Sequence, residues 1–175
     1  IIDFKAPYKR ISMYDAIKEH TGIDISSMNE EELRGVCRQL GIHVDNSMGK
    51  GKLIDEIFGG KCEGHYVQPT FIIDYPVEMS PLTKKHRRVE GLVERFELMV
   101  NGKEIANAYS ELNDPIDQRE RFEDQLRLQE RGDDEAMFID HDFLRALEYG
   151  MPPTSGIGIG IDRLTMLLTN NASIQ

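Results

Sequence analysis

Two glutamates, Glu97 and Glu104, have the type and spacing that first suggest chemistry in this sequence. They flank Asn101-Gly102, a dipeptide that tolerates the two positive φ values of a type I′ turn and predicts a β-hairpin over residues 92–111. Such a hairpin pairs Glu97 with Ala106 and places both carboxylates on one face as diagonal neighbours. They repel each other unless a cation lies between them, and a divalent metal with oxygen ligands is the natural candidate. An ordinary solvated face is the alternative.

A glycine-rich segment, residues 154–164, is the second stretch with chemical character. Glycine alternates with isoleucine there, so one face of the predicted strand lacks side chains, as a strand needs when a flat ligand lies against its backbone. The strand passes directly into a helix, and Arg163 falls in the first helical turn, where a guanidinium and exposed amides favour an anion. Close strand packing and an ion pair between Asp162 and Arg163 are the alternatives.

The elements that must position these residues can be predicted from helix caps and hydrophobic spacing. Three short amphipathic helices are predicted in the first sixty residues, with Ser12 and Asn29 as caps of the first two. The third starts near Lys50 and is expected to end at Gly59-Gly60. These helices predict a small helical layer whose apolar residues pack as core, and none of them offers catalytic residues.

From Pro69 the hydrophobic spacing becomes that of strands. Residues 70–75 predict a strand, and the loop after it carries a basic cluster at 84–88 that would either meet phosphates or stay solvated. Beyond the hairpin, Asp114 and Asp140 are predicted to cap two more helices. The last helix is expected to bury Leu164, Leu167 and Leu168. Together these elements combine helices with strands, among them the antiparallel hairpin.

The composition fits a globular chain, since 39% of the 175 residues are hydrophobic and 30% are charged. A net charge of −10 argues against wrapping nucleic acid with the whole surface but leaves room for a local basic patch. No apolar run approaches the roughly 18 residues of a membrane span. Two isolated cysteines favour a reducing, cytoplasmic setting, and the histidines show no zinc-ligand spacing. Because neither an initiator methionine nor a leader is present, we expect a piece of a longer protein.

Several stretches resemble, in the right order, the catalytic domain of class II aminoacyl-tRNA synthetases, and most of all its lysine-specific members. GIGIGIDRLTMLLTN is similar to motif 3 of that class, the strand and arginine-bearing helix that hold ATP. RFELMVNGKEIANAYSELNDPIDQRERF is similar to the region before motif 3 in the lysine enzymes, and TFIIDYPVEMSPL to a strand of the subgroup that also contains the aspartate and asparagine enzymes. By this resemblance, residues 1–66 are a helical insertion and residues 67–175 are the C-terminal part of the catalytic core.

The resemblance implies an α+β fold, in which a six-stranded antiparallel β-sheet is flanked by helices, and a reaction in two steps. Lysine would attack the α-phosphate of ATP, and the resulting adenylate would acylate the 3′ end of tRNA(Lys). Such chemistry depends mostly on positioning and on charge neutralisation. Magnesium would be the cofactor, and the full-length enzyme would be a cytoplasmic homodimer that does not contact a membrane.

The resemblance also assigns the nucleotide site. Glu97 and Glu104 would bind the magnesium that bridges the ATP phosphates, in agreement with the hairpin argument. Arg163 would be the catalytic residue that holds ATP, against the bare face formed by Gly158 and Gly160.

The lysine pocket is assigned to Asn107, Tyr109 and Glu111, with Asn107 also at the ATP site and Glu111 pairing with the lysine ammonium group. An uncharged analogue would leave that buried carboxylate unpaired. Strict alternation along the strand, however, turns these three side chains away from Glu104. We therefore predict a β-bulge between Glu104 and Asn107, which re-aims the later side chains.

Motifs 1 and 2 and the anticodon-binding barrel of that class are not found in this sequence. We therefore expect the C-terminal portion of a catalytic domain, inactive in isolation. Two other hypotheses stay open. One is a paralogue that loads lysine onto a protein instead of a transfer RNA, and the other is a non-catalytic scaffold that binds a partner.

Overall fold

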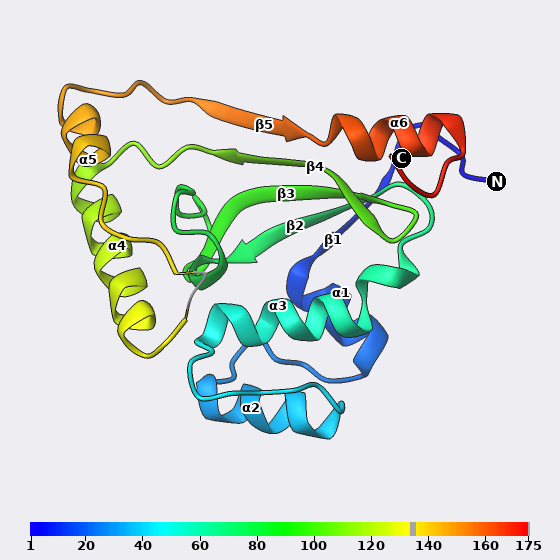
Figure 1. The fold of residues 1–175 in the computed structure, drawn as a ribbon, viewed down its shortest axis with the longest axis horizontal. Helices are drawn as coiled ribbons and strands as arrows, with labels where there is room; N and C mark the ends of the chain where they lie inside the picture. The colour runs from blue at the N-terminus through cyan, green and yellow to red at the C-terminus, as the bar shows by residue number, and fades with distance from the viewer. Residues whose placement is uncertain (134–135, 175) are drawn as a thin grey trace.

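A computed structural model describes residues 1–133 and 136–174, and its centre is a mixed five-stranded sheet (Figure 1). Across the sheet the strands follow chain order: β1 (Lys9–Ser12), β2 (Thr70–Pro76), β3 (Leu92–Val100), β4 (Lys103–Ser110) and β5 (Ser155–Ile159). The α+β class is confirmed, and pairing is antiparallel from β2 to β5. β1 is instead parallel to β2 because three helices connect the two strands and return the chain in the same direction. The described residues thus form five strands, where the resemblance implied six.

The turn of the central hairpin has the conformation that its sequence predicts. Asn101 and Gly102 have φ angles of 55° and 67°, both positive, as a type I′ turn requires. The turn is also held from outside, because its two amides donate to the backbone oxygens of Val67 and Tyr66, each at 3.0 Å. The hairpin is therefore fixed to the segment that joins the helices to the sheet.

A bulge at Ile105 sets the register of the hairpin beyond the turn. Glu104 pairs with Met99 on β3, as a two-residue turn at Asn101-Gly102 requires, but the register then shifts, so that Glu97 lies opposite Asn107. The predicted bulge between Glu104 and Asn107 is confirmed. The expected pairing of Glu97 with Ala106 is wrong, because Ile105 is an extra residue on β4.

The first three helices form a layer beside β1 and β2 (Figure 1). They are α1 (Met13–Thr21), α2 (Glu30–Gln39) and α3 (Lys50–Lys61). Both predicted caps are present: the Ser12 side chain accepts from Asp15 N, and Asn29 forms a reciprocal capping box with Glu32. α3 continues through Gly59-Gly60, where an end was predicted, because packing of its buried face outweighs the low helix propensity of glycine.

The helical layer and the sheet share one hydrophobic core. Its fully buried members include Ile17, Leu33, Leu53, Ile54 and Ile57 from the helices and Ile72, Tyr75, Val93 and Met99 from the strands. The division into residues 1–66 and 67–175 stays a prediction, and the two parts pack as one unit across this core.

Two further helices stand at the end of the sheet where β4 finishes (Figure 1). They are α4 (Pro115–Glu130) and α5 (His141–Glu148), which are capped by Asp114 and Asp140 as predicted. They pack on each other through buried residues: Phe122, Leu144 and Leu147. A short 3-10 turn, η1 (Glu63–His65), follows α3, and a second, η2 (Val77–Met79), follows β2.

β5 leads directly into α6 (Ile161–Thr169), as the sequence predicts. The expected burial of its leucines is wrong in the described chain, since Leu164 and Leu167 are only half-buried and Leu168 is 72% exposed. The reason is that little of the described chain lies over this side of the sheet edge, where Ile157 and Ile159 are exposed as well. Among the described residues, no helix is both long and apolar enough to cross a membrane.

Candidate catalytic site

One face of the hairpin carries a continuous row of polar side chains. The cross-strand pairs are Glu97 with Asn107 and Arg95 with Tyr109, and the bulge keeps Glu104 on the same face as Glu97. The amide Nδ2 of Asn107 donates to Glu97 Oε1 at 3.3 Å. The bulge therefore brings together residues that strict alternation would have separated.

The two predicted metal ligands line a common cavity of about 260 Å³. Glu97 and Glu104 reach it from the sheet, and three more carboxylates reach it from α3 and η1: Asp55, Glu56 and Glu63. The opening helices, which were expected to offer no catalytic residues, thus contribute carboxylates to the lining of this cavity, and whether any of them takes part in catalysis stays a prediction. The sequence signal that was missed is that α3 places Asp55 and Glu56 beside the apolar residues that dock it on the sheet.

Carboxylate oxygens of this kind suit a hard divalent cation such as magnesium. Within the described residues, no three histidines, cysteines or carboxylates lie close enough to hold an ion by themselves. Magnesium commonly takes one or two carboxylates and completes its shell with substrate phosphates and water. The pair Glu97 and Glu104 fits that pattern.

Burial tunes the charge in this cavity. Burial raises the pKa of Glu97, and the neighbouring Arg95 guanidinium acts against that rise by favouring the charged form. Burial likewise raises the pKa of Glu63, and the positive charge of Arg163 opposes that shift. Each of the two carboxylates therefore lies near one arginine, whose charge offsets only part of the effect of burial.

Arg163 lies where the sequence places it, in the first turn of α6. Its Nη1 donates to the backbone oxygen of Glu104 at 2.7 Å and lies 3.6 Å from the Glu104 carboxylate. Gly160 occupies the N-cap and has no side chain to cap the helix, so the first amides of α6 stay open to an anion. About half of the Arg163 side chain is exposed, which leaves its guanidinium accessible to a ligand.

The glycine face of β5 extends the same polar row. Gly158 pairs with Asn107 and Gly156 with Tyr109, so both glycines face the side of the sheet that carries the carboxylates. A Cβ on Gly158 would meet only Asn107 O, at 3.9 Å, so its outer side is open. A Cβ on Gly156 would collide with Glu111 Oε1, so this glycine makes room for the glutamate.

Tyr109 and Glu111 lie at the far end of this row from Glu104 and Arg163. Burial raises the pKa of the Glu111 carboxyl and of the Tyr109 hydroxyl, and in Tyr109 the nearby Glu111 adds to the rise. The Glu111 amide donates to Thr154 O at 2.9 Å, which ties the end of β4 to the strand that follows. The predicted residues thus form a strip along β4 and β5. Glu104 and Arg163, which the sequence assigned to ATP and its magnesium, lie at one end, and Glu111, which it assigned to the lysine ammonium group, lies at the other.

Arg95 is the main residue that the sequence interpretation missed. It contacts Glu97 and Asn107 directly, with its Nη2 2.5 Å from Glu97 Oε1 and its Nε 3.2 Å from Asn107 Oδ1. Alternation within β3 could have revealed it, because residues 95 and 97 must share a face.

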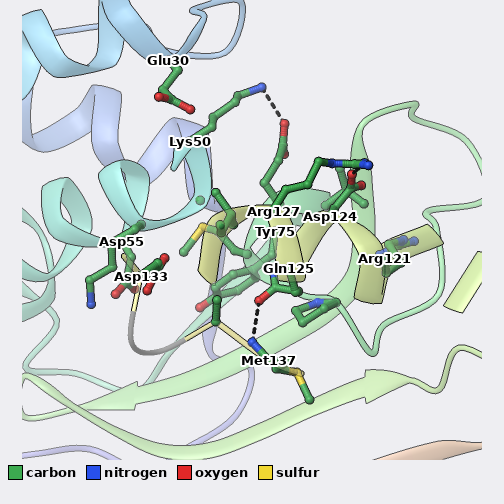
Figure 2. A pocket seen from close by; sticks show the side chains of 18 of the residues that line it. Glu30, Lys50, Asp55, Tyr75, Arg121, Asp124, Gln125, Arg127, Asp133 and Met137 are labelled. Carbon is green, nitrogen blue, oxygen red and sulfur yellow. Dashed lines mark hydrogen bonds and ion pairs between the residues drawn. The ribbon is translucent and has the colours of Figure 1, made fainter. Parts of the chain in front are cut away.

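A larger cavity of about 730 Å³ adjoins the carboxylate cavity and shares Asp55 and Glu97 with it. Figure 2 shows this cavity, with side chains of α2, α3 and α4 grouped around Tyr75. Charges of both signs line it and are largely paired with one another, as in Lys50–Glu78 at 2.8 Å and Arg131–Glu30 at 2.7 Å. It therefore concentrates neither sign of charge.

The basic cluster at 84–88 is largely engaged by its own neighbours. Lys85 pairs with Asp117 at 3.1 Å and Arg87 with Glu94 at 3.0 Å, while Lys84 donates to Asn113. Backbone pairing of Lys85 with Val93 also ties the segment to the sheet. Contact of this segment with RNA phosphates stays a prediction.

Comparison with known proteins gives a consistent result. The family described as tRNA synthetases class II (D, K and N) matches residues 1–175. The chain is 75% identical over all 175 residues to a lysine–tRNA ligase of Porphyromonas gingivalis, and covers 30% of that protein. It is 71% identical over 175 residues to the lysine–tRNA ligase of Azobacteroides pseudotrichonymphae, covering 35%, and 72% identical over 174 residues to that of Christiangramia forsetii, covering 31%. The chain thus spans about a third of the length of these relatives.

Proposed function

The chain belongs to the class II tRNA synthetases of the D, K and N group, and from this premise we propose that it is the C-terminal part of the catalytic domain of a lysine–tRNA ligase. The identity of 71% to 75% with proteins of that name supports the lysine specificity. The observation that carries the assignment is the convergence of Glu97 and Glu104 on one cavity, with Arg163 bound at the base of Glu104.

The proposed reaction joins the lysine carboxylate to the α-phosphate of ATP, with pyrophosphate as leaving group, and then transfers the lysyl group to the 3′ end of tRNA(Lys). Magnesium, when bound, would neutralise the charge of the ATP phosphates. Glu97 and Glu104 would hold it from the sheet, and Arg163 would bind the nucleotide at the open N-terminus of α6. Gly158 would leave the flat space against which the nucleotide lies.

The lysine substrate would lie along β4. Asn107, which contacts Glu97, would mark the boundary between nucleotide and amino acid. Glu111 would pair with the ammonium group at the far end, beside Tyr109. The space left by Gly156 supports this role, because it admits the Glu111 carboxylate to the glycine-lined face.

The same proposal gives the partners: ATP, lysine and tRNA(Lys), with a second copy of the full-length chain in a cytoplasmic homodimer. The second candidate, a paralogue that transfers lysine to a protein, would share every residue of this strip. The acceptor separates the two, so the full-length protein should charge tRNA(Lys) with radioactive lysine and leave protein unlabelled.

The test of the lysine site is Glu111→Gln in the full-length protein. Loss of the carboxylate leaves the lysine ammonium unpaired, so kcat/KM for lysine in lysine-dependent pyrophosphate exchange should fall about 100-fold or more. Binding of ATP, measured by calorimetry, should stay within a factor of about two, because Glu111 lies at the other end of the strip.

Glu123→Gln, an exposed change on α4, is the matched control and should leave both quantities unchanged. An unaltered exchange rate in Glu111→Gln would rule out the proposed role. Absence of lysine-dependent exchange in the unmodified full-length protein would rule out the function itself.

A further inference from the structure

The side chain of Arg95 contacts several residues of the candidate site at once. Its side chain is only 16% exposed, and each of its three nitrogens has a partner. Nε donates to Asn107, Nη2 to Glu97, and Nη1 to both Ser80 Oγ at 2.8 Å and Met79 O at 3.1 Å. One guanidinium therefore joins β3, β4 and the segment after β2.

The ring of Tyr75 supports this guanidinium from β2. The central carbon of Arg95 lies 4.5 Å from the centre of the ring, a distance typical of a cation–π contact. Tyr75 is itself only 1% exposed, so its ring is a fixed support. The guanidinium is therefore held by contacts from four segments of the chain.

These contacts fix the orientation of Asn107. Because Arg95 only donates, the oxygen of the Asn107 amide must face it, and the nitrogen is then turned toward Glu97. Arg95 and Asn107 both reach Oε1 of Glu97, and neither contact uses Oε2. The two side chains thus set the direction in which Glu97 presents its second oxygen.

The hydrogen bonds from Arg95 to Met79 and Ser80 also connect it to the lysine end of the strip. Ser80 is 3% exposed, and three residues further on Thr83 forms a β-bridge with Glu111. Movement of Arg95 would therefore reach Glu97, Asn107 and the segment that borders Glu111.

We propose that Arg95 is a positioning residue that couples the metal carboxylate Glu97 to the lysine-pocket residue Asn107, so that both ends of the site are ordered by one side chain. This inference rests on the proposed function for the identity of the two ligands. Arg95 itself contacts neither the metal nor the substrates. Its effect on catalysis passes through the side chains that it holds.

The test is Arg95→Lys in the full-length protein, because lysine keeps the positive charge but has no planar fork to bind three partners. The first measurement needs no activity: Mn²⁺ binding in the presence of a non-hydrolysable ATP analogue, followed by electron paramagnetic resonance. The dissociation constant for Mn²⁺ should rise about tenfold, as is typical when a group that orients a metal ligand is lost.

The second measurement is the KM for lysine in pyrophosphate exchange, which should also rise about tenfold, since Asn107 loses its orientation. Combining Arg95→Lys with Asn107→Ala should raise the KM for lysine by clearly less than tenfold over Asn107→Ala alone, because part of the effect of Arg95 passes through that amide and only the part that passes through Ser80 remains. Ser80→Ala, which removes one contact of Nη1 and keeps the arginine, should shift both quantities in the same direction by a smaller factor.

Arg87→Lys is the matched control, because Arg87 is 80% exposed and pairs with Glu94 away from the strip. It should leave both measurements unchanged. A purely structural role of Arg95 would lower the melting temperature or the active fraction while the Mn²⁺ constant and the lysine KM stay the same, and that result in Arg95→Lys and Ser80→Ala would overturn the proposal. Should the unmodified protein bind Mn²⁺ with ATP yet show no lysine-dependent exchange, the proposed function would fail while the Mn²⁺ measurement still decides the role of Arg95.

Discussion

At the scale of single residues, Glu97 combines two opposing demands. It is largely buried, with 14% of its side chain exposed, which favours the neutral carboxyl, yet the proposed role needs the carboxylate. Arg95, whose Nη2 lies 2.5 Å from Glu97 Oε1, offsets part of the effect of burial by favouring the charged form. Because burial still dominates, the pKa of Glu97 is raised, and its protonation begins at a higher pH than for an exposed glutamate.

This raised pKa predicts a pH-dependent metal requirement. As the pH falls toward the raised pKa of Glu97, protonation removes a ligand, so the magnesium concentration for half-maximal pyrophosphate exchange should rise. Glu97→Gln should lower kcat/KM for MgATP about 100-fold or more, and its remaining magnesium requirement should change less with pH than that of the unmodified protein. Titration of magnesium between about pH 5.5 and 8 in both proteins checks this.

Glu94→Gln provides the control, since residue 94 lies on the same strand but faces away from the strip, toward Arg87 and Ser110. Its magnesium titration should match that of the unmodified protein at every pH. If Glu97→Gln kept the pH dependence of the unmodified protein, Glu97 would not be the titrating ligand.

At the scale of elements, the two glycines of β5 have different surroundings. Gly156 faces Glu111, whereas Gly158 faces open space beside Asn107. Substitution by alanine should therefore separate the two halves of the site. Gly156→Ala should raise the KM for lysine about tenfold, because the added Cβ takes the place of Glu111 Oε1 and the carboxylate must move away from the position in which it would pair with lysine.

Gly158→Ala is the matched partner of that experiment. The added methyl group meets no close atom of the chain, so the melting temperature should not change. It would occupy the face against which the nucleotide lies, so the KM for ATP should rise while the KM for lysine stays the same. Equal effects of both substitutions on both substrates would contradict the division of the strip.

The sequence predicted those elements whose local chemistry is decisive. The φ angles at Asn101 and Gly102, the capping box at Asn29 and the passage from β5 to α6 all follow from residues within one turn of each other. A bulge between Glu104 and Asn107 was also predicted, because the resemblance places Asn107 in one cleft with Glu104 and strict alternation does not; the structure has this bulge at Ile105.

Features that depend on distant segments were not predicted. Glu63 and Asp55 lie more than thirty residues before Glu97 in sequence and reach its cavity only because α3 docks on the sheet. The hydrogen bond from Arg95 to Ser80 likewise connects β3 to the segment after β2. Gly59-Gly60 misled the prediction of the end of α3, since tertiary packing holds the helix together there.

At the scale of the whole molecule, the hydrophobic core and the region around the candidate site differ in how far their apolar side chains are buried. The core between α1–α3 and β2–β3 is closed, with ten or more fully buried side chains such as Leu33, Leu53 and Ile57. By contrast, β5 and α6 expose large apolar residues: Ile157, Ile159, Ile161 and Leu168. The candidate site lies beside this exposed region, and one of its residues, Arg163, lies on α6.

This contrast predicts that residues 1–175 fold around the closed core but do not activate lysine by themselves. Circular dichroism should show mixed helix and strand with a cooperative thermal transition, since burial of the helical layer does not depend on β5 and α6. Lysine-dependent pyrophosphate exchange should be at least about 100-fold below that of the full-length protein, because positioning of ATP needs groups on both sides of the phosphates. In the chain described, Arg163 is the cation that stands at Glu104, and its guanidinium is about half exposed. Exchange at a rate close to that of the full-length enzyme would mean that the strip along β4 and β5 is sufficient for adenylate formation, and the dependence on the remaining two thirds of the relatives' length would have to be abandoned.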